Sequence, residues 1–473
     1  MPFRTRREHD LLGERDIPAD AYYGIHTLRA LENFPITGTP ISIYPDLIVA
    51  LACIKQAAAL ANSELELLDD AKTGAIGAAC TEIRQGALLG EFVVDVIQGG
   101  AGTSTNMNAN EVVANRALEL MGHRRGEYGF LHPVEHVNMS QSTNDVYPTA
   151  VKLALHFGIQ RLTRAMAELR AAFEAKSREF GGVLKIGRTQ LQDAVPMTLG
   201  QEFSTYAVML GEDEQRLQEA ALLIHEINLG ATAIGTGITA HPDYAPLVCR
   251  RLSEITGVDL VVASNLVEAT QDAGAFVQLS GVLKRVAVKL SKTCNDLRLL
   301  SSGPRAGLNE IDLPAMQAGS SIMPGKVNPV IPEVMNQIAF EVIGNDVTVS
   351  FAAEGGQLQL NAFEPIIAHS LFKSINHLTA GCLTLKDRCV AGIRANVARM
   401  RAMVQNSIGL VTALNPYIGY ERATAVAQEA HESGASVYDL VLAKGWLSKD
   451  KLDEILRPEV LTAPQLFSAE RRE

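Results

Sequence analysis

The 473-residue sequence is poor in aromatic residues, in cysteine and in basic charge. Aromatic residues make up 5% of the chain although hydrophobic residues make up 47%, so the apolar mass is mainly Ala, Leu and Val. Such a composition suits packed helices. The six cysteines are scattered without the spacing of metal ligands or of a disulfide framework. This pattern predicts small buried thiols in a reducing compartment.

Charge and hydropathy restrict the partners and the compartment of the chain. The net charge is −11, which argues against nucleic-acid binding because that function needs a basic face. Residues 1–20 are dense with charge and lack the apolar core of a signal peptide. The apolar run 47–54 is too short to span a bilayer. We therefore expect a cytoplasmic protein that has neither nucleic acid nor a membrane as partner.

The middle of the chain carries long helical patterns. Residues 145–180 keep one helical period, with apolar side chains spaced by three or four residues, until two glycines end it. Similar patterns predict helices over 198–228, 265–300, 328–354 and 363–390. The apolar seams of the first and third of these helices comprise Val151, Leu155, Ile159, Leu162, Met166, Leu169, Phe173, Phe276, Leu279, Leu283, Val286, Leu290 and Leu297.

Shorter elements flank these helices. We expect helices over 45–63, 70–89, 110–121 and 424–432, short helices capped by Ser436 and Ser448, a glycine-rich loop over 99–105 and irregular structure over 123–138. No strand alternation is sustained enough to suggest a major sheet, so the expected fold class is all-α. The expected domains are a mixed helix and loop domain at 1–140, a central helical bundle at 141–395 and a small helical domain at 396–473.

The segment 319–329 combines two hydroxyls, a cation and an amide in a loop that leads into a helix. Asn328 followed by Pro329 is typical of an N-cap and a first helical residue. A cation such as Lys326 is unfavourable near the positive end of a helix dipole. A bound carboxylate would resolve this conflict, because helix N-termini and lysine both attract anions. On these residues alone, an ordinary connection between helices is the alternative.

A second polar stretch, Ser142-Thr143-Asn144, precedes the long helix at 145–180. Its hydroxyls and the N–H groups of the helix start could hold a carboxylate, but helix capping is equally consistent with these residue types. Thr103 in the glycine-rich loop could donate another hydrogen bond, although by itself a turn role is favoured. The run 230–237 lacks the Lys-Ser/Thr ending of a phosphate loop, so we interpret it as a connection between helices.

Several stretches, in the same order along nearly the whole chain, resemble the fumarase/aspartase superfamily. Besides the segment at 319–329 they are Tyr22-Tyr23-Gly24 with Asn33-Phe34, Gly99-Gly100-Ala101-Gly102-Thr103-Ser104 with Asn106-Met107-Asn108, Ser140-Gln141-Ser142-Thr143-Asn144-Asp145, Gly187-Arg188-Thr189-Gln190 and Gly230-Ala231-Thr232-Ala233. The resemblance implies a three-domain, all-α fold with a central bundle of long helices. It also implies a homotetramer whose core contains twenty helices.

Within the superfamily the chain most resembles the ammonia-lyases that convert L-aspartate reversibly to fumarate and ammonia through an enediolate intermediate. The resemblance implies that Ser320 is the general base and acts as an alkoxide. The substrate-binding residues that it implies are Thr103, Ser142, Thr143 and Ser321 for the β-carboxylate, Thr189, Lys326 and Asn328 for the α-carboxylate, Asn144 for the amino group, and Gln190 and Met323 beside them.

Cofactor use and the alternative activities also follow from these motifs. No organic cofactor is expected, and no ligand cluster requires the magnesium that activates some relatives. Gln190 stands where related enzymes often carry His, which argues against a His-based proton relay. Fumarate hydration to L-malate is the alternative activity, against which Thr143 and Gln190 stand. A catalytically silent structural protein is a remoter alternative, and the intact Ser320, Lys326 and Asn328 argue against it.

The helix at 145–180 separates two of the motifs. At 1.5 Å per residue it is roughly 50 Å long, with Thr143 at its start and Thr189 beyond its end. If both residues belong to one site, they come from different subunits, and a symmetric antiparallel oligomer would bring them together. The resemblance implies sites shared between three subunits of a homotetramer. The alternative is a monomer in which the motifs are independent loops.

Overall fold

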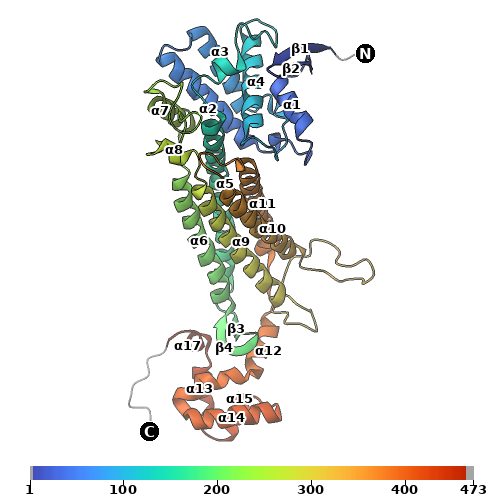
Figure 1. Ribbon diagram of the computed structural model, residues 1–473. Helices are drawn as coiled ribbons and strands as arrows, with labels where there is room; N and C mark the ends of the chain where they lie inside the picture. The colour runs from blue at the N-terminus through green and yellow to red at the C-terminus, as the bar shows by residue number, and fades with distance from the viewer. Residues whose placement is uncertain (1–3, 465–473) are drawn as a thin grey trace. The chain divides into compact units, whose positions relative to one another are not determined.

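The computed structural model describes residues 4–464 of the chain, and helices dominate this part (Figure 1). By compactness the chain divides into two units. Unit 1 contains 1–163, 215–287 and 338–379, and unit 2 contains 164–214, 288–337 and 380–473. Both units combine segments that are distant in sequence. These two units do not test the predicted division into three consecutive domains, which stays a prediction. The outermost residues of those domains, 1–3 and 465–473, lie outside the described part.

Four helices of unit 1 precede the long helices. They are α1 (Ile25–Asn33), α2 (Pro45–Glu64), α3 (Asp70–Arg84) and α4 (Thr103–Leu120). Helix α2 confirms the expected helix at 45–63, whereas α3 ends before the expected position. Helix α4 begins seven residues earlier than expected. The earlier start was not predicted because intrinsic propensity disfavours a helix in an asparagine-rich segment. Tertiary hydrogen bonds offset that preference: Asn108 is fully buried, accepts from the Val93 N–H and donates to the Glu91 carbonyl.

Helix α2 is long and apolar enough to cross a membrane by length and composition alone, in contrast to the short run predicted from the sequence. However, 72% of its most apolar window is buried inside the protein. The buried positions surround the helix and include the ammonium-bearing Lys55. Helix α2 therefore belongs to the core of unit 1.

Five long helices follow: α5 (Thr143–Glu179), α6 (Leu199–Leu223), α9 (Gly274–Leu300), α10 (Val330–Glu354) and α11 (Glu364–Arg388). The seam residues predicted on α5 and α9 are all buried, which confirms the helical period. The helix expected over 265–300 is interrupted between α8 (Leu266–Ala269) and α9. At this break the Asp272 carboxylate accepts from the Gly274 N–H at the start of α9. Such a side-chain bond favours a helix terminus over continuation.

The strands of the described residues form four two-stranded sheets and no major sheet. They pair β1 (Thr5–Asp10) with β2 (Gly13–Pro18), β3 (Leu184–Thr189) with β4 (Gln192–Thr198), β5 (Glu226–Ile227) with β6 (Val261–Val262), and β7 (Ile311–Asp312) with β8 (Arg394–Ala395). The β3–β4 hairpin was missed in the sequence. Its turn places Gln190 and Leu191 at φ of 55° and 65°, a conformation that propensity does not suggest for these residues.

The remaining helices are short. They are α7 (Tyr244–Thr256) in unit 1 and, in unit 2, α12 (Val397–Asn406), α13 (Val411–Ile418), α14 (Tyr420–Ser433), α15 (Val437–Ala443), α16 (Lys449–Ile455) and α17 (Pro458–Leu461). Ser436 and Ser448 cap α15 and α16, as predicted: each hydroxyl accepts a backbone N–H three residues further on. The segment expected to be irregular contains one turn of π-helix, 133–137.

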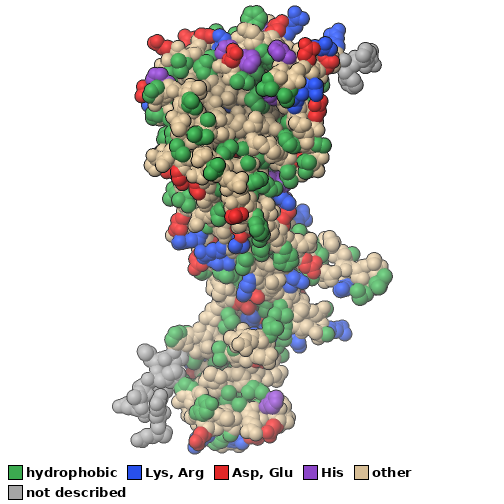
Figure 2. Space-filling view, in the orientation of Figure 1, with side chains coloured by type: hydrophobic (Ala, Val, Ile, Leu, Met, Phe, Trp, Pro, Cys, Tyr) green, Lys and Arg blue, Asp and Glu red, His purple; other side chains and the backbone are tan. Residues whose placement is uncertain are grey.

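Hydrophobic side chains reach the surface on the long helices, and Figure 2 shows hydrophobic side chains on one face of the molecule. Val208 of α6 is 60% exposed, and Phe340 and Phe351 of α10 are 62% and 73% exposed. Large aromatic side chains on the outside of a helix are typical of surfaces that contact another chain.

Two histidines of unit 1 form a pair for which we predict a pH effect. His156 Nδ1 lies 2.9 Å from His225 Nε2, and burial lowers the pKa of both imidazoles from 6.5. As the pH falls below about 6.5, the unfolded chain therefore binds more protons than the folded chain, and stability decreases. His225→Gln should lose less stability between about pH 7.5 and 5.5 than the wild type, measured by urea unfolding. The exposed His9→Gln serves as control; an equal loss in His225→Gln and wild type would contradict the prediction.

Candidate functional site

The residues predicted to form the site fall into two groups, one in each unit. Unit 1 contains Thr103, Ser142, Thr143 and Asn144. Unit 2 contains Thr189, Gln190, Ser320, Ser321, Met323, Lys326 and Asn328.

The start of helix α5 holds the polar stretch of unit 1. Ser142 precedes the helix, and its N–H donates to Asp145 Oδ1 at 3.1 Å. The Ser142 hydroxyl accepts from the Asn144 N–H at 3.3 Å, and Thr143 is the first helical residue. All three polar residues are partly exposed, so their side chains can reach a ligand. Capping and ligand binding are therefore compatible at this helix terminus.

Asp145 joins this helix start to the 230–233 segment. Its Oδ2 accepts from the N–H groups of Gly230 at 3.2 Å and Thr232 at 2.8 Å. The carboxyl group is fully buried, and burial raises its pKa to about 6. Asn144 Nδ2 donates to the Ala233 carbonyl at 2.6 Å, which ties the same two segments together again. The connection predicted at 230–237 thus supports the helix start directly.

Thr103 comes to the same region through a glycine. A Cβ at Gly102 would lie 2.3 Å from the Tyr147 ring, so only glycine allows the loop to pack on this tyrosine of α5. Gly102 also has a φ of 91°. Thr103 follows as the first residue of α4 and is exposed, and its hydroxyl donates to the Gly100 carbonyl at 2.8 Å. In this arrangement the hydroxyl acts within a turn, and the residue is exposed.

A buried lysine lies behind the helix start and was missed in the sequence. Lys55 of α2 is fully buried, and its Nζ donates to Asn106 Oδ1, Asn138 Oδ1 and Gln141 Oε1 at 2.7, 2.9 and 2.9 Å. Asn106 Nδ2 in turn donates to Thr143 Oγ1 at 3.2 Å. Burial lowers the pKa of Lys55 to about 7. The available sequence signal was a single cation within a helix that is otherwise apolar.

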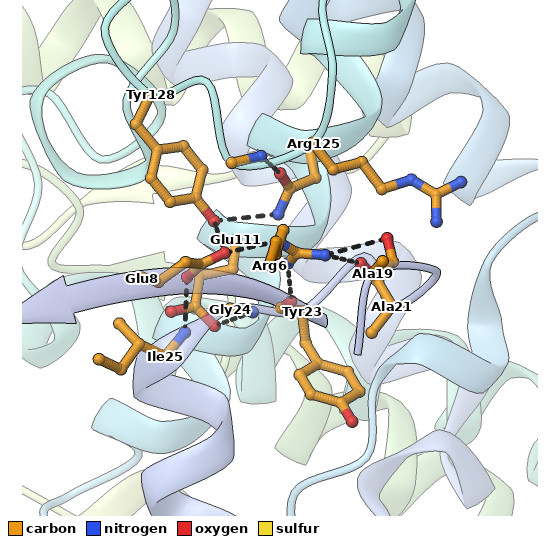
Figure 3. A network of polar contacts seen from close by, with 12 residues as sticks. Arg6, Glu8, Ala19, Ala21, Tyr23, Gly24, Ile25, Glu111, Arg125 and Tyr128 are labelled. Atoms are coloured by element: carbon orange, nitrogen blue, oxygen red, sulfur yellow. Dashed lines mark hydrogen bonds and ion pairs between the residues drawn. The ribbon is translucent and has the colours of Figure 1, made fainter. Parts of the chain in front are cut away.

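Tyr23 and Gly24 of the motif Tyr22-Tyr23-Gly24 lie in a network of polar contacts in unit 1 (Figure 3). The Glu111 carboxylate accepts from the N–H groups of Gly24 and His26 at 2.7 and 2.8 Å. A Cβ at Gly24 would lie 2.7 Å from a Glu8 oxygen, so the close approach of these acidic groups excludes a side chain there. These contacts fix the start of α1 against α4.

In unit 2 the 319–328 loop is closed at its base. The Gly319 N–H donates to the Lys326 carbonyl at 2.8 Å, and Asn328 Nδ2 donates to the Gly319 carbonyl at 2.7 Å. A Cβ at Gly319 would lie 2.5 Å from the Lys326 oxygen, which explains the glycine. Between these ends residues 321–327 are exposed, including Ser321 and Met323.

Ser320 accepts hydrogen bonds from its own loop. Its Oγ accepts hydrogen bonds from the N–H groups of Ile322 at 3.2 Å and Met323 at 3.0 Å. Donors directed at an oxygen favour its charged form, so these bonds would stabilise an alkoxide relative to a free hydroxyl. The arrangement therefore provides part of the activation that a serine base needs.

The prediction that Asn328 is the N-cap of the following helix was wrong. Helix α10 begins at Val330, and the Asn328 side chain is instead the donor that closes the loop. The amide makes this bond because the Gly319 carbonyl lies beside it, a contact between residues nine apart in the chain. Lys326 therefore lies in the exposed loop and not in the first turn of the helix.

Thr189 and Gln190 are exposed at the end of strand β3 and in the hairpin turn. The fully buried Glu310 anchors the hairpin. Its carboxylate pairs with Arg188 Nη1 at 2.6 Å and with Lys185 Nζ at 2.9 Å. The bond to Arg188 fixes the residue directly before Thr189. Glu310 was not predicted as a supporting residue.

These two groups offer hydroxyls, amides and one ammonium group, which are hydrogen-bond donors suited to carboxylates. No group of three or more His, Cys, Asp or Glu side chains able to hold a metal ion occurs between residues 4 and 464. The donor set thus matches an acidic organic ligand.

Comparison with known proteins gives the same result for nearly the whole chain. A family model described as "Lyase" matches residues 13–344, and one described as "Fumarase C C-terminus" matches residues 410–463. An aspartate ammonia-lyase of Pseudomonas canavaninivorans is 61% identical over 98% of both proteins. That of Helicobacter pylori (strain J99) is 58% identical over 98% of this chain and 99% of its own length.

Solved structures agree in fold. The cobalt-bound fumarate lyase:delta crystallin from Brucella melitensis has a TM-score of 0.95 and 58% identity, covering 98% of this chain and 100% of its own. A class II fumarase from Schistosoma mansoni has a TM-score of 0.91 and 36% identity, covering 96% of this chain and 98% of its own. The chain therefore belongs to the aspartate ammonia-lyase family of the fumarase/aspartase superfamily.

Proposed function

We propose that the protein catalyses the reversible deamination of L-aspartate to fumarate and ammonia. The observation that carries this proposal is the identity of 54–61% with several aspartate ammonia-lyases over nearly their full length. Fumarate hydration is less supported, since the fumarase among the similar structures is only 36% identical.

The reaction requires removal of a weakly acidic proton from the carbon beside a carboxylate. The resulting enediolate carries an additional negative charge, and hydrogen-bond donors aimed at it lower the barrier most. In this proposal the β-carboxylate and its enediolate form are bound by hydroxyls. The residues assigned to it are Thr103, Ser142, Thr143 and Ser321.

The other end of the substrate is assigned to cationic and amide donors. Lys326, Asn328 and Thr189 would bind the α-carboxylate, and Asn144 would contact the amino group. Gln190 and Met323 would complete the surroundings. Asn328 Nδ2 is already bonded to Gly319, so in this role it would share or exchange that donor when substrate binds.

Ser320 is proposed as the general base. The two hydrogen bonds that its oxygen accepts favour the alkoxide, and a closed loop would strengthen these bonds by excluding water. The oxygen would take the proton from the β-carbon, after which the C–N bond breaks and ammonia leaves. The alkoxide is regenerated when the proton is released to solvent.

Assembly is part of the proposal. The two groups of site residues belong to separate units of the chain, and hydrophobic side chains such as Phe340 and Phe351 are exposed on α10. A homotetramer would bury such surfaces and combine groups from three subunits into one site. The proposed setting is the cytoplasm, in keeping with six cysteines that are all buried and free. No organic cofactor is proposed, and magnesium would act only as an activator.

The activity is tested by adding L-aspartate or L-malate to the purified enzyme. Fumarate absorbance should rise with L-aspartate, and ammonia should appear in equal amount. The rise with L-malate should be at least about a hundredfold slower, a difference of roughly 2.7 kcal/mol in transition-state stabilisation. Fumarate formation from L-malate alone would establish the hydratase instead.

Ser320→Ala tests the general base. The variant should lose proton abstraction while its carboxylate anchors still bind aspartate. Solvent deuterium should therefore fail to enter the substrate at the β-carbon, and activity should fall by at least about a hundredfold. Ser433→Ala, an exposed serine at the end of α14, is the matched control and should retain activity. Normal exchange in Ser320→Ala would exclude Ser320 as the base.

Shared sites predict complementation between inactive variants. Thr143→Ala and Ser320→Ala chains, mixed under conditions that exchange subunits, should regain part of the activity because some sites receive only intact groups. Native mass spectrometry would confirm mixed oligomers. Mixed oligomers without recovery would show that each site is built within one chain.

A further inference from the structure

A chain of hydrogen bonds in unit 1 runs from the buried Lys55 through Asn106 to Thr143. We propose that Lys55 and Asn106 are positioning residues that set the direction of the Thr143 hydroxyl, so that it presents its proton to a bound carboxylate. The inference rests on the proposed function in one respect: Thr143 binds an acidic ligand. It assigns a role to two residues that do not themselves touch the substrate.

The hydrogen-bond donors of the Lys55 ammonium group are all used within the protein. A lysine has three N–H donors, and here each meets an amide oxygen, at 2.7 Å for Asn106 and 2.9 Å for Asn138 and Gln141. The side chain is 0% exposed, so water does not compete for these donors. A buried ammonium group must be satisfied in this way, because unpaired burial of a charge is strongly unfavourable.

The amides facing Lys55 are each fixed from their other side. Gln141 Nε2 donates to the carbonyls of Val137 and Met139, both at 3.0 Å. Asn138 Nδ2 donates to the Gln141 carbonyl at 3.2 Å. Their oxygens must therefore point at Lys55, and reversal of either amide would place an NH₂ group against an ammonium group.

The same requirement orients Asn106. Because its Oδ1 accepts from Lys55, its Nδ2 is left as the donor. The two N–H groups meet Asn138 Oδ1, which also accepts from Lys55, and Thr143 Oγ1, both at 3.2 Å. Asn106 is buried to 1% exposure, so this orientation is held by the protein and not by solvent.

The consequence falls on Thr143. A hydroxyl has one proton and two lone pairs, and here one lone pair is occupied by the Asn106 N–H. Among residues 4–464 the hydroxyl proton of Thr143 has no hydrogen-bond acceptor in the structure, and the residue is partly exposed. The hydroxyl is therefore available as a donor. A carboxylate accepts but does not donate, so this orientation suits an acidic ligand.

Through this network the buried ammonium group of Lys55 orients a neutral donor, the hydroxyl of Thr143. Lys55 does not need to approach the substrate, since Asn106 transmits the direction of its N–H bonds. A preorganised donor requires no reorientation when the ligand carboxylate becomes more negative in the enediolate. This is where a positioning role differs from packing alone.

Asn106→Asp tests the direction of these bonds at nearly constant shape. The new carboxylate still accepts from Lys55, but its second oxygen would accept the Thr143 proton and remove that donor from the site. The measured quantity is the Kd of succinate, an unreactive four-carbon dicarboxylate. Loss of a hydrogen bond to a charged group should raise it by about tenfold or more.

A double-mutant cycle separates this effect from general damage. Thr143→Val should raise the succinate Kd by about tenfold in the wild type, but by less than about twofold when Asn106→Asp is present, since the donor is already lost. Thr143→Ser keeps the hydroxyl and should bind nearly as the wild type does. Additive effects of Asn106→Asp and Thr143→Val would overturn the proposal.

Asn108→Asp is the matched control. Asn108 is on the same helix and is fully buried, and its side chain bonds the Glu91 carbonyl and the Val93 N–H. Its variant should lose thermal stability while the succinate Kd and the full effect of Thr143→Val are retained. A rise of the Kd equal to that of Asn106→Asp would mean that any buried charge on α4 produces the effect, and would also overturn the proposal.

The outcomes distinguish this inference from the proposed function. Because the cycle measures succinate binding, it gives an answer even if L-aspartate is not deaminated; coupling without turnover would overturn the proposed function alone. A wild-type protein that binds no succinate would overturn both. If Asn106→Asp does not assemble, Asn106→Ala should weaken the Thr143→Val effect in the same cycle, since nothing then orients the hydroxyl, and an unweakened effect would overturn the proposal.

Discussion

Two ionisable side chains, Lys55 and Asp145, are buried at the start of helix α5, and each is satisfied by hydrogen bonds. Asp145 accepts from three backbone N–H groups, and Lys55 donates to three side-chain amides. A buried charge without such partners would destabilise the fold by several kcal/mol. This constraint brings the loops at 138–142 and 230–233 and helix α4 to the same helix terminus. The polar groups of unit 1 hold their positions because they lie on the segments that satisfy Lys55 and Asp145.

The loop of unit 2 solves a related problem with backbone groups. Gly319 and Asn328 close its base, and the N–H groups of Ile322 and Met323 are directed at Ser320. No charged side chain supports this oxygen within the loop in the described structure. The hairpin that contains Thr189 instead uses a buried ion pair, since Glu310 holds Arg188. Unit 1 therefore supports its site residues with the buried Lys55, Asp145 and amides, and unit 2 with a loop closed by hydrogen bonds and a hairpin held by a buried ion pair.

Sequence patterns predicted most of the helices, and the errors have local causes. Residues 145–180 were identified because an uninterrupted period over many turns has few alternative explanations, and all the predicted seam residues are buried. The early start of α4 and the break before α9 were missed because Asn and Asp side chains form hydrogen bonds that propensity does not describe. The β3–β4 hairpin was missed because its turn places Gln190 and Leu191 at positive φ without glycine.

The sequence by itself determined the long helices, the all-α class and the membership of a family, because periodicity and ordered motifs are properties of the chain alone. It also supplied the residue types that could bind a dicarboxylate. Only the tertiary structure decided how these groups are directed. Lys55 and Asn106 are 51 positions apart, and neither motif nor period relates them. The orientation of a buried amide depends on partners from distant segments, so the direction of the Thr143 hydroxyl follows only once those segments are packed together.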